Sequence, residues 1–219
     1  MKKSLLSATL CTMPMTLLAA LVALVAMLTL VGQAQALTLD DLQQRFAQQP
    51  VVRAHFDQQR TISGITHPLR SSGELLISRD KGLWWQQQQP FTLTLILNDS
   101  RMVQITGNQP PEVITAEGNP QMFRFNHLLR ALFQADRAVL EQNFTVTFTD
   151  KGQDNWQLVL IPKASPLDKL FTAITLTGQT YLEHIQLDDK QGDRTAITFS
   201  QQHTDPKLLS HDEQQRFIQ

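Results

Sequence analysis

The hydrophobic pattern of the chain begins with one continuous apolar run. This run extends from Leu17 to Val31. Two lysines precede it, and Ala34-Gln35-Ala36 follows it. A basic start, an apolar stretch and an Ala-x-Ala sequence are typical of a cleavable export signal. A membrane-spanning helix needs about 20 apolar residues, so an uncleaved anchor is the less favoured alternative. We therefore predict a signal peptide at residues 1–36, cleaved after Ala36, and a single domain at residues 37–219.

The next segment has a helical period. In Leu37–Gln49, the apolar residues Leu39, Leu42 and Phe46 recur on one helical face. Thr38 begins a Thr-x-x-Asp sequence, which is typical of a capping box at a helix start. The segment is predicted to be an amphipathic helix.

After residue 50 the period changes to two. Apolar residues alternate with polar ones, which is typical of half-buried strands in an antiparallel sheet. Turn-forming clusters, including Ser63-Gly64 and Ser71-Ser72-Gly73, separate these segments. The pattern predicts about ten strands. These lie within 52–57, 74–78, 91–97, 101–106, 112–115, 144–149, 156–161, 172–177, 181–187 and 195–201. The tryptophan-containing segment that begins at Leu83 is one further candidate strand.

A second helical interval interrupts the strands. Asn119-Pro120 is typical of a helix start, and Met122–Phe133 then carries large apolar residues at helical spacing. Shorter helical turns are predicted at 136–142 and 166–171. The tail after Pro206 is polar, and its pattern indicates no clear element.

The pair Trp84-Trp85 places large apolar area on both faces of a strand, because adjacent strand residues point in opposite directions. One face can belong to the core, whereas the other needs a cover. The candidates are the 122–133 helix, the N-terminal helix or a ligand. Ile96 is out of phase in its strand, which indicates burial on both faces there too. A curled sheet with covering helices can enclose an apolar pocket, and the alternative is that the helices simply fill the interior as packed core.

Composition and charge exclude several classes of function. Only 18% of the 219 residues are charged, 27 are glutamine and the net charge is −1, so the basic surface that nucleic-acid binding requires is missing. The one cysteine, Cys11, falls in the predicted signal peptide. The six histidines are scattered over different predicted elements, and no catalytic or phosphate-binding motif is present. We predict no cofactor, no metal site and no enzymatic activity.

Several motifs together resemble the LolA family of periplasmic lipoprotein carriers. The segment Gly73–Trp85 resembles the signature hairpin of the family, and Pro90 follows it as the family pattern requires. Val52–Gln59, Asn98–Arg101 and Leu160–Ser165 are similar to three further family motifs, in the same order. Asp80 stands where the family has proline, and residues 102–105 lack the family's aromatic-rich sequence, as in a divergent member or paralogue.

The resemblance implies a mainly β (α+β) fold: an incomplete antiparallel β-barrel of about 10–11 strands with a helical lid over an apolar cavity. In the family this cavity receives acyl chains of a lipoprotein from an inner-membrane donor complex and passes them to an outer-membrane acceptor. Arg79 matches the arginine that binds lid carbonyls and holds the cavity closed. The predicted cavity residues are Leu75, Ile77, Leu83, Trp85, Leu93, Leu95, Phe125 and Leu129.

We therefore expect a soluble, monomeric carrier of acylated cargo, a lipoprotein or another lipid, in a Gram-negative periplasm. Two alternatives stay open. One is a periplasmic lipid-binding sensor of the RseB type, and the other is a lipid-acting enzyme whose site is not recognisable in the sequence.

Overall fold

The computed structural model divides the chain into two units, residues 1–35 and 36–219. The structure describes residues 36–98, 101–115, 117–118, 128 and 130–218. The predicted signal peptide and most of the 122–133 segment lie outside these residues. All of the described strands and helices belong to the second unit.

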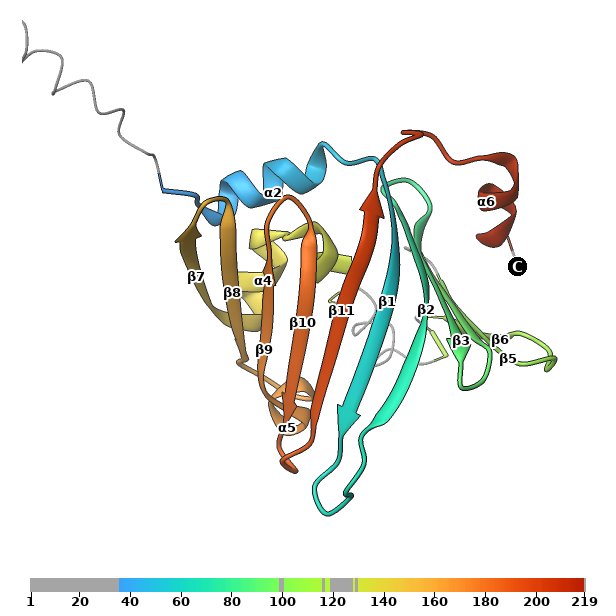
Figure 1. Ribbon diagram of the computed structural model, residues 1–219, viewed down its shortest axis with the longest axis horizontal. Helices are drawn as coiled ribbons and strands as arrows, with labels where there is room; N and C mark the ends of the chain where they lie inside the picture. The colour runs from blue at the N-terminus through green and yellow to red at the C-terminus, as the bar shows by residue number, and fades with distance from the viewer. Residues whose placement is uncertain (1–35, 99–100, 116, 119–127, 129, 219) are drawn as a thin grey trace, which may run out of the picture. The chain divides into compact units, whose positions relative to one another are not determined.

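Eleven strands form a single antiparallel sheet with the order β6-β5-β4-β3-β2-β1-β11-β10-β9-β8-β7 (Figure 1). Strands that follow one another in the sequence pair with each other, except β6 and β7, and the pairing of β1 with β11 joins the two halves. Strands β6 and β7 are the two edges, so the sheet is open, as the incomplete barrel requires. The strands are β1 (Val51–Thr61), β2 (Leu69–Ser78), β3 (Gly82–Gln89), β4 (Leu93–Leu97), β5 (Arg101–Thr106), β6 (Glu112–Thr115), β7 (Phe144–Gly152), β8 (Asn155–Pro162), β9 (Phe171–Gly178), β10 (Leu182–Asp189) and β11 (Arg194–His203).

The described helices are short. They are α2 (Leu39–Ala47), α4 (Arg137–Asn143), α5 (Leu167–Leu170) and α6 (His211–Arg216), and residues 128 and 130–134 are also helical. Helix α2 begins with the predicted capping box, in which the side chains of Thr38 and Asp41 each accept a hydrogen bond from the other's backbone N–H. This box satisfies amide groups that the first helical turn leaves without partners.

One face of the sheet carries most of the apolar core, which we call the inner cluster. The strands contribute alternate residues such as Phe56, Leu75 and Phe199 to it, and α2 contributes its apolar stripe. Helix α4 adds Leu140, and α2 and α4 are both seen against the β7–β11 half in Figure 1. The antiparallel strands that the alternating pattern predicts and the mainly β, open fold that the resemblance implies are thereby confirmed.

The opposite face carries a smaller outer cluster. Its members Leu76, Trp84, Ile96 and Val103 alternate with inner-cluster residues along β2–β5, and Phe217 packs on them from the C-terminal end. The prediction that both faces are buried at Trp84-Trp85 and Ile96 is confirmed. On the Trp85 side, the expected N-terminal helix contributes to the inner cluster. On the Trp84 side, the cover is instead Phe217, which follows helix α6 in the polar tail for which no element was predicted.

Two local predictions were also wrong. Ser71-Ser72-Gly73 lies inside β2 rather than in a turn, at an irregularity in the pairing of β2 with β3. Gly73 is needed there because a Cβ atom would collide with the backbone carbonyl of Gln86. Phe91 lies before β4 rather than within it, and its side chain is 58% exposed.

Candidate functional site

A cavity of about 210 Å³ lies between helix α2, the start of β1, the end of β2 and residues 133–136. We call it the α2–β2 cavity. Aliphatic and aromatic side chains form its wall, whereas the rest of its lining is polar. The wall is Phe46, Ala47, Val52, Ile77 and Phe133, and the polar lining is Gln43, Gln49, Arg79, Gln134 and Asp136.

The apolar wall continues into the inner cluster. A void of about 30 Å³ shares Phe46, Val52 and Phe133 with the cavity and reaches Phe199. The ring of Phe133 lies 5.9 Å from that of Phe199, centre to centre, in an edge-on arrangement. Phe199 in turn meets Trp85 edge-on at 6.2 Å. A continuous aromatic path therefore runs from the cavity into the interior.

Three predicted cavity residues lie at or beside the α2–β2 cavity. Ile77 lines it directly, and Leu75 lines the adjoining void. Leu83 borders a third void, of about 10 Å³, together with Ile77 and Arg130. Burial lowers the pKa of the Arg130 guanidinium, although arginine keeps its charge in proteins. The end of β2 and the start of β3 thus lie beside these spaces, and the role of the three residues in binding stays a prediction.

The other predicted cavity residues are deeper or not described. Trp85 and Leu95 are half-buried and pack against the inner cluster. Trp85 stacks on Phe56 with ring centres 3.9 Å apart. Leu93 is half-buried on β4 but does not belong to that cluster. Phe125 and Leu129 lie outside the described residues.

Arg79 follows the last residue of β2, and its exposed side chain lines the α2–β2 cavity. Its backbone N–H donates to the carbonyl of Pro50 at 3.0 Å, which fixes the start of β1 beside the end of β2. Arg79 therefore lines the cavity together with Gln134 and Asp136. Gln134 is the last residue of the helical segment 130–134, and Asp136 is the N-cap of helix α4. The role of lid lock stays a prediction.

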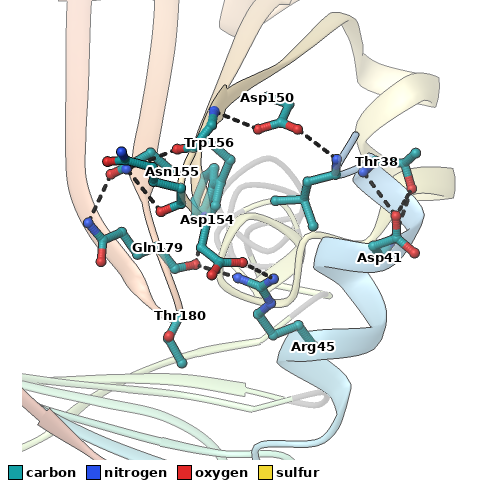
Figure 2. A network of polar contacts seen from close by, with 12 residues as sticks. Thr38, Asp41, Arg45, Asp150, Asp154, Asn155, Trp156, Gln179 and Thr180 are labelled. Carbon is teal, nitrogen blue, oxygen red and sulfur yellow. Dashed lines mark hydrogen bonds and ion pairs between the residues drawn. The ribbon is translucent and has the colours of Figure 1, made fainter. Parts of the chain in front are cut away.

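Polar contacts hold helix α2 on the turns at one end of the sheet (Figure 2). Arg45 donates to the carbonyl of Gln179 at 3.1 Å and to the carboxylate of Asp154 at 3.2 Å. The same carbonyl accepts from the indole N–H of Trp156 at 2.7 Å. Gln49 donates to the carbonyl of Thr180 at 3.2 Å. The α2 wall of the cavity is thereby anchored to the β7–β8 and β9–β10 turns.

Helix α4 is joined to α2 by Arg137. Its guanidinium lies 2.8 Å from a carboxylate oxygen of Asp40 and 2.7 Å from one of Glu141. These hydrogen bonds raise the pKa of Arg137. By contrast, Ala131 and Leu132 are buried in the inner cluster and Phe133 packs against it. The 131–133 turn therefore meets the sheet through apolar side chains.

The lining of the α2–β2 cavity indicates what kind of ligand it suits. Within the described residues, no group of three or more His, Cys, Asp or Glu side chains is placed to hold a metal ion. None of the helices in that part of the chain is both long and apolar enough to cross a bilayer. The cavity offers an apolar wall with hydrogen-bonding groups beside it, which fits a ligand with an apolar body and a polar end.

Sequence reasoning did not assign Phe46, Val52 and Phe133 to the cavity. Each was placed correctly on the apolar stripe of its own element. An apolar stripe does not reveal which of its residues borders a cavity. That depends on how α2, the strands β1 and β2 and residues 133–136 pack together. The glutamines at positions 43, 49 and 134 carried no distinguishing signal in a chain so rich in this residue.

Comparison with known proteins adds a family. Residues 47–211 match the family model described as "Outer membrane lipoprotein carrier protein LolA". The chain is 29% identical over 147 residues to the outer-membrane lipoprotein carrier protein of Chromohalobacter salexigens, which covers 67% of each chain. A solved LolA superfamily protein from Nitrosomonas europaea is 9% identical, with a TM-score of 0.42 over 81% of this chain and 99% of that one. A DUF1329 family protein from Desulfovibrio piger is 12% identical, with a TM-score of 0.43 over 80% and 96%.

Proposed function

Because the chain belongs to the LolA family of outer-membrane lipoprotein carriers, we propose that it binds the acyl chains of a lipoprotein, or of another acylated lipid, and shuttles them through a Gram-negative periplasm towards the outer membrane. The observation that carries this proposal is the α2–β2 cavity, whose apolar wall leads into the inner cluster. An inner-membrane donor and an outer-membrane acceptor belong to the same proposal.

Transfer of apolar surface supplies the binding energy. Each methylene group removed from water contributes about 0.8 kcal/mol, so a few acyl chains bind tightly without any charged contact. Release then needs an acceptor that competes for the chains or a movement that opens the site. A carrier of this kind does no chemistry on its cargo.

The α2–β2 cavity is small for a ligand site. At about 210 Å³ it is smaller than the roughly 300–1,000 Å³ that ligand sites usually offer. We infer that loading moves the 131–133 turn aside, because apolar side chains hold that turn whereas Arg45 ties α2 to the sheet. Acyl chains would then replace the turn's contacts with the inner cluster.

Native mass spectrometry of delipidated protein with a synthetic triacylated lipopeptide tests the proposal. We expect a one-to-one complex with the lipopeptide and none with the same peptide lacking acyl chains. Ile77→Asp should abolish the complex, because a carboxylate in the apolar wall must be desolvated when acyl chains enter.

The matched control is Ile161→Asp, which replaces a side chain that is 50% exposed on β8 and should leave the complex intact. A wild-type protein that binds no lipopeptide would contradict the proposal and favour a simple packed core. Loss of acyl chains from the lipopeptide would instead indicate an enzyme.

A further inference from the structure

The carboxylate of Asp150, which lies on the β7–β8 hairpin (Figure 2), accepts a hydrogen bond from the backbone nitrogen of Leu37. Leu37 N donates to Oδ2 of Asp150 at 2.8 Å. The other oxygen, Oδ1, accepts from the backbone N–H of Gly152, also at 2.8 Å. One oxygen of the carboxylate is therefore bound to its own hairpin. The other oxygen is bound to the Leu37 nitrogen, just before the start of helix α2.

Leu37 is fixed from its other side too. Its side chain is half-buried and packs against the inner cluster, whereas Ala36 is exposed. The next residue, Thr38, is the N-cap of α2. The chain thus enters the folded domain at Leu37, and the position of the Leu37 nitrogen is determined by both packing and hydrogen bonding.

This nitrogen is the atom that the predicted cleavage after Ala36 would release. Hydrolysis of the Ala36–Leu37 peptide bond consumes one water molecule. The hydroxyl group goes to the carbonyl carbon of Ala36, which leaves as a carboxylate, and the amine of Leu37 takes up a proton. An α-amino group has a pKa of about 7.7–8.0, and a carboxylate at 2.8 Å favours its charged form.

We propose that removal of residues 1–36 creates an ion pair between the α-ammonium of Leu37 and Asp150, and that this pair locks the start of helix α2 on the β7–β8 hairpin. The inference rests on the predicted cleavage site and not on the identity of the cargo. Asp150 is a binding site for the new N-terminus, formed before the ammonium exists.

The physical consequence is a change in the strength of one bond without a change in its geometry. Before cleavage the Leu37 nitrogen is a neutral amide donor. Because the Asp150 carboxylate is ionised, the bond is already charge-assisted. After cleavage the nitrogen carries a positive charge too, and the attraction between the two opposite charges is added to the hydrogen bond. Cleavage would then complete the anchoring of α2, whose later turns Arg45 already ties to Asp154 and Gln179.

Two N-terminal forms of the protein, each with and without Asp150→Asn, test the proposal. One form begins at Leu37. The other carries ten additional Gly and Ser residues ahead of Leu37, so that its nitrogen is again an amide. We expect Asp150→Asn to lower the Tm of the Leu37 form by about 2–4 °C more than that of the extended form.

Asp154→Asn is the matched control, because Asp154 contacts α2 through Arg45 rather than through Leu37. It should lower the Tm of both forms equally. Equal losses from Asp150→Asn in both forms would overturn the proposal, and so would an intact mass of the exported protein that begins at any residue other than Leu37. If Asp150→Asn does not fold, the two N-terminal forms with Asp150 intact are compared at low and high salt. A higher Tm of the Leu37 form that disappears at high salt would support the ion pair, and equal Tm values at low salt would overturn it.

Discussion

At the scale of single residues, the best-buried ion pair joins β1 to the C-terminal helix. The guanidinium of Arg53 meets both carboxylate oxygens of Glu213, at 2.6 and 2.8 Å, and the two side chains are only 13% and 14% exposed. Arg53 and the backbone N–H of Ser210 hold the pKa of Glu213 at about 2, below its usual 4.5. Such bidentate, charge-assisted contacts are the strong ones among surface pairs.

We predict that Glu213→Gln lowers the free energy of unfolding by about 1–2 kcal/mol at pH 7, as loss of a hydrogen-bonded charge does. Because the folded-state pKa lies below the unfolded one, the ionised carboxylate stabilises the protein above about pH 4.5. That contribution is lost as the pH falls towards about 2. Urea unfolding of both proteins between pH 7 and pH 2 measures the difference, which should shrink over this window. A difference independent of pH would contradict the assignment.

At the scale of elements, α6 is the clearest case of a helix that local pattern reading missed. Its sequence holds a capping box, with Ser210 as N-cap and Glu213 at the third helical position. With six residues, it has no room for a repeating apolar stripe. Its apolar anchor, Phe217, follows the helix, and Arg216 lies over the ring of Trp84 at 4.5 Å. The sequence therefore predicts that Trp84 is covered, but it does not predict that Phe217 covers it.

We predict that Phe217→Ala costs about 2 kcal/mol of stability, the value of burying one large apolar side chain. Phe217 is 5% exposed against the outer cluster, whereas the neighbouring Ile218 is 65% exposed. Ile218→Ala is thus a matched control and should change stability by less than about 0.5 kcal/mol. Chemical denaturation gives both values, and tryptophan emission should shift to the red only in the Phe217 variant. Equal effects would show that α6 does not cover Trp84.

Helix α2 and two short strands could be predicted from the sequence. The α2 stripe, its capping box and the strands Arg101–Thr106 and Glu112–Thr115 stand where the pattern predicted them. Gly73 misled the prediction because glycine marks both turns and close backbone approach. The pairing of Arg53 with Glu213 could not be predicted, since no local pattern connects residues that are 160 positions apart in the sequence.

At the scale of the whole molecule, the open sheet has two kinds of cover, one held by polar contacts and one by apolar packing. Polar contacts tie α2 and α6 to the sheet, through Arg45 and Arg53 respectively. The 131–133 turn is held by apolar packing, and the side chain of Arg79 lines the cavity beside this turn. Opening and closing can therefore be confined to one part of the covering layer.

We predict that Arg79→Leu retains a bound lipopeptide but passes it less efficiently to acceptor membranes. Replacing the guanidinium removes the predicted lid lock and adds apolar surface beside the cavity. Arg70→Leu is the control, because Arg70 lines a separate surface groove with Asp57 and Thr198. Transfer of a fluorescent lipopeptide from each protein to outer-membrane vesicles measures the rate. Normal transfer by the Arg79 variant would remove Arg79 from this role.

The turn that joins β1 to β2 lies at the far end of these strands from α2 (Figure 1). Ile65 in this turn is 51% exposed, and Gly64 has open space around its Cα. The only cysteine, Cys11, belongs to the predicted signal peptide. A thiol introduced at Ile65 would therefore be a unique handle for a dye or spin label, attached away from α2, α6 and the Leu37 nitrogen. The labelled protein could then be followed in lipopeptide binding and transfer assays while α2, α6 and the cavity lining stay unmodified.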